Sequence, residues 1–316
     1  MKVLDGVLGF AIGDSLGVPV EFVSRLELST NPVLDMEGNG THNQVEGTWS
    51  DDTSMLIATM DAIIDAKNID YKKIMDNFCL WYYGKKYNPH DVLFDIGITT
   101  SVAINNYING KDINSCGVNG YYDNGNGSLM RILPLSYCFM ENSFSDLEMS
   151  SIVNSVSSLT HAHSISCLGC YIYTRFIMNL LSGKSIKDSY LSLGNLDLSM
   201  YDLDTVSVYK RVLSGELIDL SVDSIKSSGF VVSTLEASLW CNLTSSSYSE
   251  AVLKAVNLGD DTDTVAALTG AIAGIKYGID SIPKKWLDTL VKSSYLVELS
   301  NNYEEVITKN KIKVKE

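Results

Sequence analysis

The sequence has few basic residues, and this shortage argues against one large class of functions. Its 316 residues include 24 lysines and arginines against 38 aspartates and glutamates, which gives a net charge of −14. Unspecific nucleic-acid binding depends on a basic surface, so we do not expect it. A small ligand that carries phosphate stays possible, because bound cations can supply local positive charge.

Long apolar runs and an export signal are also missing from the sequence. No uninterrupted apolar stretch is long enough to span a bilayer, and Asp5, Gly9 and Gly13 interrupt the N-terminal run in a way that signal peptides do not. The six cysteines are scattered, and the C-x-x-C formed by Cys167 and Cys170 has no second pair to complete a zinc site. We therefore expect free thiols, no membrane association and a cytoplasmic location.

Signals for β-structure are scarce as well. Runs that alternate between apolar and polar residues are few, and hairpin turns are not evident, so the sequence predicts a helical protein. We expect a helix interrupted by glycine over residues 5–20 and further helices over 54–64 and 71–83. Residues 31–46 are predicted to form a mobile polar loop without a functional residue. The lysine-rich end, residues 309–316, is expected to be solvated and frayed.

The strongest chemical signal lies in residues 259–264, with the sequence GDDTDT. Asp261 and Asp263 are two residues apart, so both can direct oxygens at one point, and Thr264 can add a third oxygen. A set of oxygen ligands suits Mg²⁺, Mn²⁺ or Ca²⁺ better than zinc. The small residues that follow predict a helix that begins near Asp263 or Thr264 and packs closely against a neighbour. The structural alternative is an acidic cap at a helix N-terminus.

A second motif of the same kind comes earlier in the chain. Ser50, Asp51, Asp52 and Thr53 precede a strong helical pattern, and Ser50 is a suitable N-cap. If the acidic residues of the two motifs converge, bare carboxylates at close range would repel one another strongly. Divalent cations would relieve that repulsion. The pair of motifs therefore predicts a metal site, and it has room for two ions.

The residues from Asp261 to Val265 also fit the D-x-D-x-[TV] signature of haloacid-dehalogenase-type phosphatases. That signature ends a buried strand and precedes the other strands of a parallel sheet. Here it lies near the end of the sequence and precedes a run of alanine and glycine, so too little chain remains for the sheet. The phosphatase is kept as an alternative to be tested against the fold.

Several motifs, taken in order, resemble those of the ADP-ribosylglycohydrolase family, which includes the dinitrogenase-reductase-activating glycohydrolase and the ADP-ribosylarginine hydrolases. The matching segments are Gly9–Gly17 with Glu21, Trp49–Thr53, Phe94–Gly97, Asn124–Arg131, Leu159–His163, Gly229–Trp240 and Gly259–Thr264. The resemblance covers nearly the whole chain up to about residue 284. It implies an all-α fold, a single compact orthogonal multi-helix domain over residues 1–316, and a binuclear Mg²⁺ or Mn²⁺ site.

The resemblance also implies roles for particular residues. The two Mg²⁺ or Mn²⁺ ions would be held by Ser50, Asp51, Asp52, Asp261, Asp263 and Thr264. Ser50 stands where the family usually has threonine, and it keeps the hydroxyl group. The implied catalytic residues are Glu21 as general acid/base, Asp52, and Asp95 as the group that orients the acceptor. ADP-ribose would be bound through its diphosphate by the main chain of Gly125, Asn126, Gly127 and Ser128, and by His161. Arg131 is either a structural ion-pair partner or a ligand contact.

The expected function is hydrolysis of the glycosidic bond that joins ADP-ribose to an acceptor, by a monomer that acts on an ADP-ribosylated protein or small molecule. Arginine on protein is the first candidate, because residues 94–97 resemble the arginine-cleaving branch of the family. Serine, a nucleic-acid base, a terminal phosphate and a small metabolite stay open as acceptors. Besides the phosphatase, the alternative is a non-catalytic ADP-ribose-binding protein, which would bind ADP-ribose without turning over any substrate.

Overall fold

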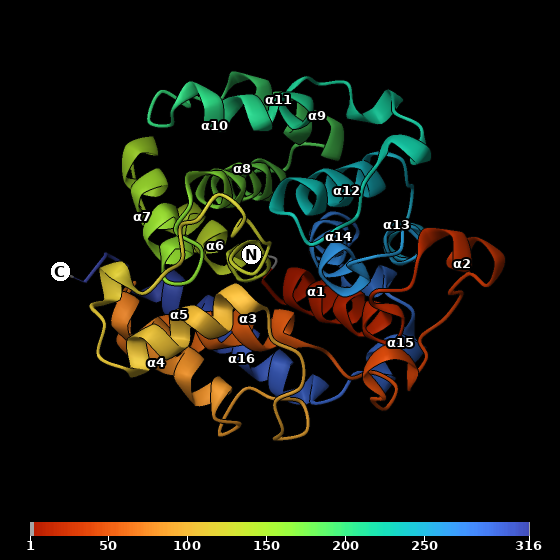
Figure 1. Cartoon of the computed structure of the whole chain (residues 1–316), viewed down its shortest axis with the longest axis horizontal. Coiled ribbons are helices and arrows are strands. Elements are labelled where there is room, and N and C mark those ends of the chain that lie inside the picture. The colour runs from red at the N-terminus through yellow and green to blue at the C-terminus, as the bar shows by residue number, and fades with distance from the viewer. Residues whose placement is uncertain (1–2, 316) are drawn as a thin grey trace.

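The computed structural model describes residues 3–315, and these residues fold into helices joined by loops and short 3₁₀ turns (Figure 1). The helices are α1 (Val3–Gly17), α2 (Arg25–Thr30), α3 (Asp51–Ala66), α4 (Tyr71–Tyr82), α5 (Ile98–Ile108), α6 (Leu133–Glu141), α7 (Asp146–Ser158), α8 (Ser164–Leu181), α9 (Ile186–Leu191), α10 (Leu203–Val208), α11 (Lys210–Leu213), α12 (Val231–Leu243), α13 (Tyr248–Val256), α14 (Thr262–Tyr277), α15 (Lys284–Thr289) and α16 (Ser293–Lys309). Between residues 3 and 315 there are isolated β-bridges but no β-strand. The all-α prediction is confirmed, and the phosphatase alternative is wrong because no strand precedes the second acidic motif.

Helices α1 and α14 lie at the centre of the domain, with their backbones in contact (Figure 1). A Cβ atom on Gly13 would lie 2.0 Å from the carbonyl oxygen of Ala266, and one on Gly270 would lie 2.1 Å from that of Gly9. Any larger residue at these two positions would force the helices apart. The close-packing face predicted for the small-residue run is therefore confirmed, although α14 begins one residue earlier than expected, at Thr262.

Helix α1 is continuous where the sequence predicted an interruption, and a 3₁₀ turn over Val18–Val20 follows it. By length and composition, Val3–Val20 is the one window within residues 3–315 apolar enough to cross a membrane, with a mean hydropathy of 1.5. The window is not an uninterrupted apolar stretch, because it contains Asp5 and Asp14. Because 83% of the window is buried inside the domain, α1 is a core helix, and α14, α16, α13 and α3 pack against it.

The start of α3 is fastened to α1 by one buried carboxylate. Asp14 accepts a hydrogen bond from the main-chain N–H of Ser50 at 2.9 Å, and from the N–H and hydroxyl of Thr53 at 3.0 and 2.5 Å. Ser50 caps the helix, as predicted, by accepting from the N–H of Asp52 at 3.2 Å. Since α14 also packs on α1, the two acidic motifs begin their helices side by side.

The remaining helices surround this centre. Helix α16 lies beside α3, and α9, α10 and α11 form an outer layer over α8 and α12 at the top of the view (Figure 1). The six cysteines are free, as expected, and all but the half-buried Cys79 are buried.

The C-terminal segment, predicted to fray over residues 309–316, contacts the domain up to Lys315, and Glu316 lies outside the described residues. Ile312 is 2% exposed. The main-chain N–H of Ile69 donates to the carbonyl of Lys313 at 2.8 Å, and the N–H of Lys315 donates to the carbonyl of Ile69 at 3.0 Å. One buried apolar residue and two main-chain hydrogen bonds hold this segment against the loop before α4, and composition alone does not show such contacts.

Candidate active site

The two acidic motifs open onto one cavity of about 370 Å³. Its walls come from the start of α3, the start of α14, the segment after α1, the loop before α5, and the loop before α6. The predicted site residues that line it are Glu21, Asp51, Asp52, Asp95, Gly125, Asn126, Gly127, His161, Asp261, Asp263 and Thr264. Residues spread over most of the chain therefore meet at one site.

Carboxylates at this cavity form two overlapping groups, one of which includes Asp14, a residue that does not line the cavity. One oxygen each from Asp14, Asp52 and Asp263 lie within 4.8 Å of one another, and so do oxygens from Glu21, Asp261 and Asp263. Asp263 belongs to both groups and connects them. Asp14 is a member that the sequence analysis assigned no role, although it stands within a matching segment. Its closeness to Asp52 and Asp263 depends on the packing of α1 against α3 and α14, which no local pattern reveals.

Hydroxyl groups link the two motifs at Asp52. Oδ2 of Asp52 accepts hydrogen bonds from Ser50 Oγ at 3.1 Å and from Thr264 Oγ1 at 3.2 Å. Oδ1 of Asp52 is buried and has no hydrogen-bond partner among the described residues. A buried acceptor of this kind is costly to leave unpaired. A bound cation would satisfy it, so the residues present fit a metal site.

Burial also disturbs the ionisation of the cluster. It raises the pKa values of Asp51, Asp52 and Asp263 well above the ordinary range, with neighbouring carboxylates adding to the effect. Burial raises the pKa of Asp14 to about 6, against the opposing hydrogen bonds from Thr53 and Ser50. Carboxyl groups that resist ionisation so close together are compatible with a metal site, because a cation restores the charged form.

These raised pKa values predict how the stability of the metal-free protein changes with pH. Between about pH 4 and pH 7 the folded protein binds more protons at these carboxyls than the unfolded chain, so the free energy of unfolding falls as pH rises. For Asp14, whose pKa rises from 3.8 to about 6, the loss is about 3 kcal/mol. About half of this loss falls between about pH 5 and pH 8, so in chelator we expect Asp14 alone to lower the melting temperature by about 2–3 °C over that range.

Thermal unfolding followed by circular dichroism in chelator, repeated with Mg²⁺ or Mn²⁺, measures this effect. The ions should reduce or reverse the fall, because they bind the ionised cluster. A metal-free melting temperature that rises steadily over the same range would contradict the electrostatic description of the site.

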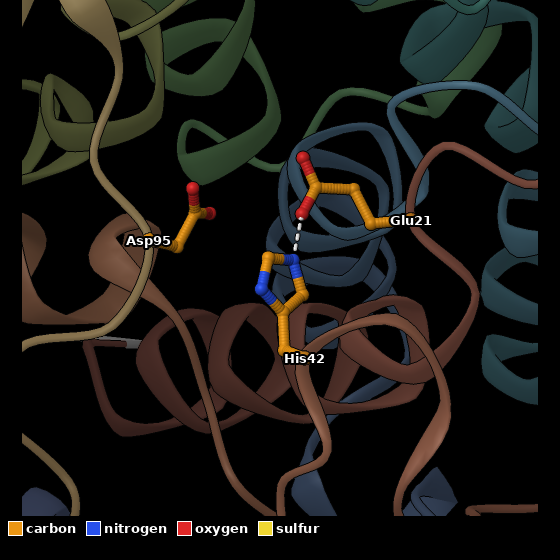
Figure 2. Close-up of side chains that lie close together, drawn as sticks. All are labelled: Glu21, His42 and Asp95. Atoms are coloured by element: carbon orange, nitrogen blue, oxygen red, sulfur yellow. Dashed lines mark hydrogen bonds and ion pairs between the residues drawn. The ribbon is translucent and has the colours of Figure 1, made fainter.

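Beside the aspartate cluster, Glu21 lines the cavity, and its carboxylate meets the ring of His42 (Figure 2). Burial raises the pKa of Glu21 to about 7, and the negative charges of Asp95 and Asp261 add to the rise. His42 Nε2 hydrogen-bonds to Glu21 Oε2, and one ligating atom each of Glu21, His42 and Asp95 lie within 4.8 Å of one another. The sequence analysis missed His42, because a lone histidine in a polar loop carries no signal of its own.

His161 lies at another wall of the cavity and is held in one protonation state. Burial and the nearby charge of Arg131 lower the pKa of His161 to about 3, so the ring is neutral. Arg131 donates to Thr160 Oγ1 at 2.8 Å, and Thr160 Oγ1 hydrogen-bonds to His161 Nδ1 at 2.8 Å. In the tautomer in which Thr160 is the donor, His161 Nε2, which lies beside Gly125 and Gly127, carries the hydrogen and can donate it to a ligand. The contacts of Arg131 are structural.

Two residues of the loop before α6 differ from their predicted role. Ser128 does not line the cavity, and its hydroxyl, which has no part in the predicted main-chain contact, accepts from Ser157 Oγ at 2.9 Å in the core. The main-chain N–H of Asn126 donates to the carbonyl of Gly229 at 3.0 Å, so it is already occupied. The Asn126 side chain donates to Asp261 Oδ2 at 2.8 Å and so braces a carboxylate of the cluster.

Comparison of the sequence with known protein families identifies the family to which the chain belongs. The profile of the ADP-ribosylglycohydrolase family matches residues 1–312. The chain belongs to the ADP-ribosylglycohydrolase family. It is therefore an enzyme of the ADP-ribosyl glycohydrolase type, as the sequence motifs predicted.

Individual members of the ADP-ribosylglycohydrolase family are similar along most of their length. The ADP-ribosylarginine hydrolase Tri1 of Serratia proteamaculans is 33% identical over 302 residues, which cover 95% of this chain and 78% of that protein. The ADP-ribosyl-(dinitrogen reductase) glycohydrolase of Rhodospirillum rubrum is 28% identical, over 92% of this chain and 90% of that protein. A solved structure of an ADP-ribosylglycohydrolase-related protein complex superposes with a TM-score of 0.81 at 27% identity, over 97% of this chain and 98% of that chain.

Proposed function

We propose that this enzyme removes ADP-ribose from arginine side chains of proteins by hydrolysing the N-glycosidic bond, with two Mg²⁺ or Mn²⁺ ions as cofactors. The observation that carries the proposal is the single cavity in which buried carboxylates of both motifs meet Glu21 and Asp95. The similarity to an ADP-ribosylarginine hydrolase supports arginine as the acceptor.

The cofactor ions would be held by Ser50, Asp51, Asp52, Asp261, Asp263 and Thr264. When bound, such ions orient the ribose hydroxyls and lower the pKa of a coordinated water. Without them, the hydroxyls of Ser50 and Thr264 point to Asp52 Oδ2, and Asp52 Oδ1 has no hydrogen-bond partner among residues 3–315. Both hydroxyl groups therefore lie within hydrogen-bond distance of Asp52, one of the residues that would hold the ions.

Glu21 is the group proposed to move the proton. In the reaction, water adds to the anomeric carbon of the ribose, the carbon–nitrogen bond breaks, and the departing arginine nitrogen gains a proton. A general acid/base works best when its pKa lies near the working pH, and the pKa of Glu21 is about 7. Because its side chain is only 8% exposed, bulk water has little access to the proton.

Asp95 and His161 would hold different parts of the substrate. The half-buried Asp95 lies beside Glu21 and lines the cavity. Its carboxylate can pair with a guanidinium through two parallel hydrogen bonds, a match that a serine or phosphate acceptor does not provide. The Nε2–H of His161 would donate to the diphosphate or to a ribose.

A second cavity of about 400 Å³ leaves room for the adenosine part of the substrate. Gly125 and Gly229 line both cavities, so the two adjoin. Tyr121, Tyr122 and Phe230 line the second cavity and are exposed. Aromatic faces of this kind can stack on a purine.

The proposal predicts metal-dependent release of free ADP-ribose from a protein ADP-ribosylated on arginine. Chelation should abolish the release, and Mg²⁺ or Mn²⁺ should restore it and raise the melting temperature, since an ion that binds the native state stabilises it. The measurement is chromatography of the released nucleotide, with a serine-linked substrate in parallel. Full activity after exhaustive chelation would refute the metal role, and equal cleavage of the serine-linked substrate would refute arginine preference. Binding of ADP-ribose without turnover of any acceptor would favour the non-catalytic alternative.

A further inference from the structure

The polar turn around Gly40 packs tightly on the segment that carries Glu21. Gly40 has a φ of +59°, and a Cβ there would lie 1.8 Å from the carbonyl oxygen of Pro19. The main-chain N–H of Asn39 donates to the carbonyl of Gln44 at 2.5 Å, and Gln44 Nε2 donates to the carbonyl of His42 at 2.9 Å. This part of the predicted mobile loop is therefore a closed turn that packs against Pro19.

Two consecutive residues of this turn bond to Glu21. Thr41 Oγ1 donates to the main-chain carbonyl of Glu21 at 2.7 Å. His42 Nε2 hydrogen-bonds to the Glu21 carboxylate, which Figure 2 shows meeting the ring on one side while Asp95 approaches from a separate segment. The turn thus holds both the backbone and the carboxylate of one residue.

The other side of the same segment is fastened to the second acidic motif. The main-chain N–H of Phe22 donates to the carbonyl of Asp260 at 2.6 Å. Oxygens of Glu21, Asp261 and Asp263 then lie within 4.8 Å of one another. A bare carboxylate in this position is repelled by its acidic neighbours, so a hydrogen-bond donor is needed to keep it facing them. His42 is the donor that the structure provides.

The His42 ring is itself held in position by aromatic neighbours. Its centroid lies 6.2 Å from that of Phe22 and 5.5 Å from that of Phe94, and its side chain is 15% exposed. A ring restricted in this way presents Nε2 to Glu21 without a large loss of rotamer freedom when the bond forms.

We propose that His42 is a positioning residue that holds the Glu21 carboxylate at the cavity and acts on hydrolysis only through Glu21. The inference rests on the proposed function, because it assigns a role in that reaction. It adds to the site a residue from a turn that contributes no predicted metal ligand and no predicted ligand contact.

Two substitutions separate the hydrogen bond from the packing of the ring. His42→Phe keeps a ring between Phe22 and Phe94 but removes the donor, whereas His42→Gln removes the ring and keeps an N–H that can reach Glu21. We expect His42→Phe to lower kcat by about 10–100-fold, as for other groups that orient a functional side chain, with KM within about 3-fold. His42→Gln should recover most of the loss. His90→Phe, the same change at an exposed histidine that hydrogen-bonds to Thr48 and does not contact Glu21, serves as the control.

A double-mutant cycle tests whether His42 acts through Glu21. In a Glu21→Gln background, adding His42→Phe should change the remaining kcat by less than about 2-fold, because the partner that it positions is already disabled. If the fold-changes in kcat of the two substitutions multiply in the double mutant, His42 has a role that does not depend on Glu21, and the inference is overturned. Loss of activity in His42→Gln as large as in His42→Phe would overturn it as well, since the donor would then not matter.

A measurement without substrate separates this inference from the proposed function. The bond to Glu21 raises the pKa of His42, so NMR titration of the metal-free protein should show that pKa falling in Glu21→Gln while the other three histidines keep theirs. If the wild type cleaves no ADP-ribosylated acceptor, the proposed function fails, and an unchanged His42 titration would refute the contact independently. If the wild type is active and His42→Phe is equally active, only the inference about His42 fails.

Discussion

Glu21→Gln is expected to bind ADP-ribose within a few-fold of the wild type while its turnover falls by about 10²–10⁴-fold, the range for a lost general acid/base. Glutamine has the same shape, and its Oε1 can still accept the hydrogen bond from His42 that the carboxylate accepts now. The variant therefore keeps the position of the side chain and loses the ability to exchange a proton. Calorimetry with ADP-ribose and single-turnover kinetics measure the two quantities separately.

Glu46→Gln is the matched control for this experiment, because it is the same change at an exposed glutamate after the turn that holds His42. It should behave as the wild type in both measurements. If Glu21→Gln turns over nearly as fast as the wild type, Glu21 is not the proton-transfer group. If affinity for ADP-ribose falls as far as turnover, Glu21 contributes to binding and its chemical role has to be withdrawn.

The parts of the site that could be predicted are those encoded in short contiguous stretches. Ser50 and Asp51 stand before a strong helical pattern, and residues 259–264 combine acidic groups with a glycine and alanine run, so local chemistry and helix start are both visible in the sequence. The all-α fold was predictable for the same reason, since helical periodicity is a local property. The sequence suggested that the two motifs meet because both combine acidic and hydroxyl residues at the start of a helix. The structure shows this contact in the hydrogen bond from Thr264 Oγ1 to Asp52 Oδ2.

The parts that could not be predicted depend on contacts between distant segments. Asp14 joins the cluster because α1 presents it to Ser50 and Thr53, more than thirty residues later in the chain. His42 reaches Glu21 through a turn that closes only against Pro19.

The wrong predictions have the same origin. The main chain of Ser128 was expected to contact the ligand, but Ser128 does not line the cavity, and its hydroxyl packs against α7 and α8. The end of the chain was expected to fray on composition alone, but the burial of Ile312 holds it to the domain. In each case a tertiary contact overrides the expectation that the local sequence supports.

Asp263 is the residue on which the metal assignment depends most. The N-cap of α14 is Asp261, so Asp263 lies within the first turn of the helix and is not its cap. It is 2% exposed, and it is the one aspartate common to both carboxylate groups of the cavity. Its Oδ1 accepts from the N–H of Thr264 at 2.8 Å, a hydrogen bond that asparagine can also accept. Asp263→Asn therefore preserves the helix start and removes one negative charge from the cluster.

This change should have opposite effects on stability with and without metal. In chelator, Asp263→Asn is expected to melt at or above the wild-type temperature, because burial and neighbouring carboxylates raise the pKa of Asp263 well above its ordinary value and make its charge unfavourable. With Mg²⁺ or Mn²⁺ the variant should gain less stability than the wild type, since at least one ion loses a charged ligand.

Activity should fall by at least about 100-fold in Asp263→Asn, because even the hydrogen-bond partners of metal ligands contribute 10–100-fold to metal affinity or activity. Asp260→Asn is the control: it is exposed, it lies in the same motif, and its φ of +62° suits asparagine. Metal analysis by mass spectrometry and thermal unfolding provide the readouts beside turnover. If Asp263→Asn binds two ions and hydrolyses substrate normally, Asp263 is a structural residue of α14, and the two ions have to be assigned to the remaining carboxylates of the cavity.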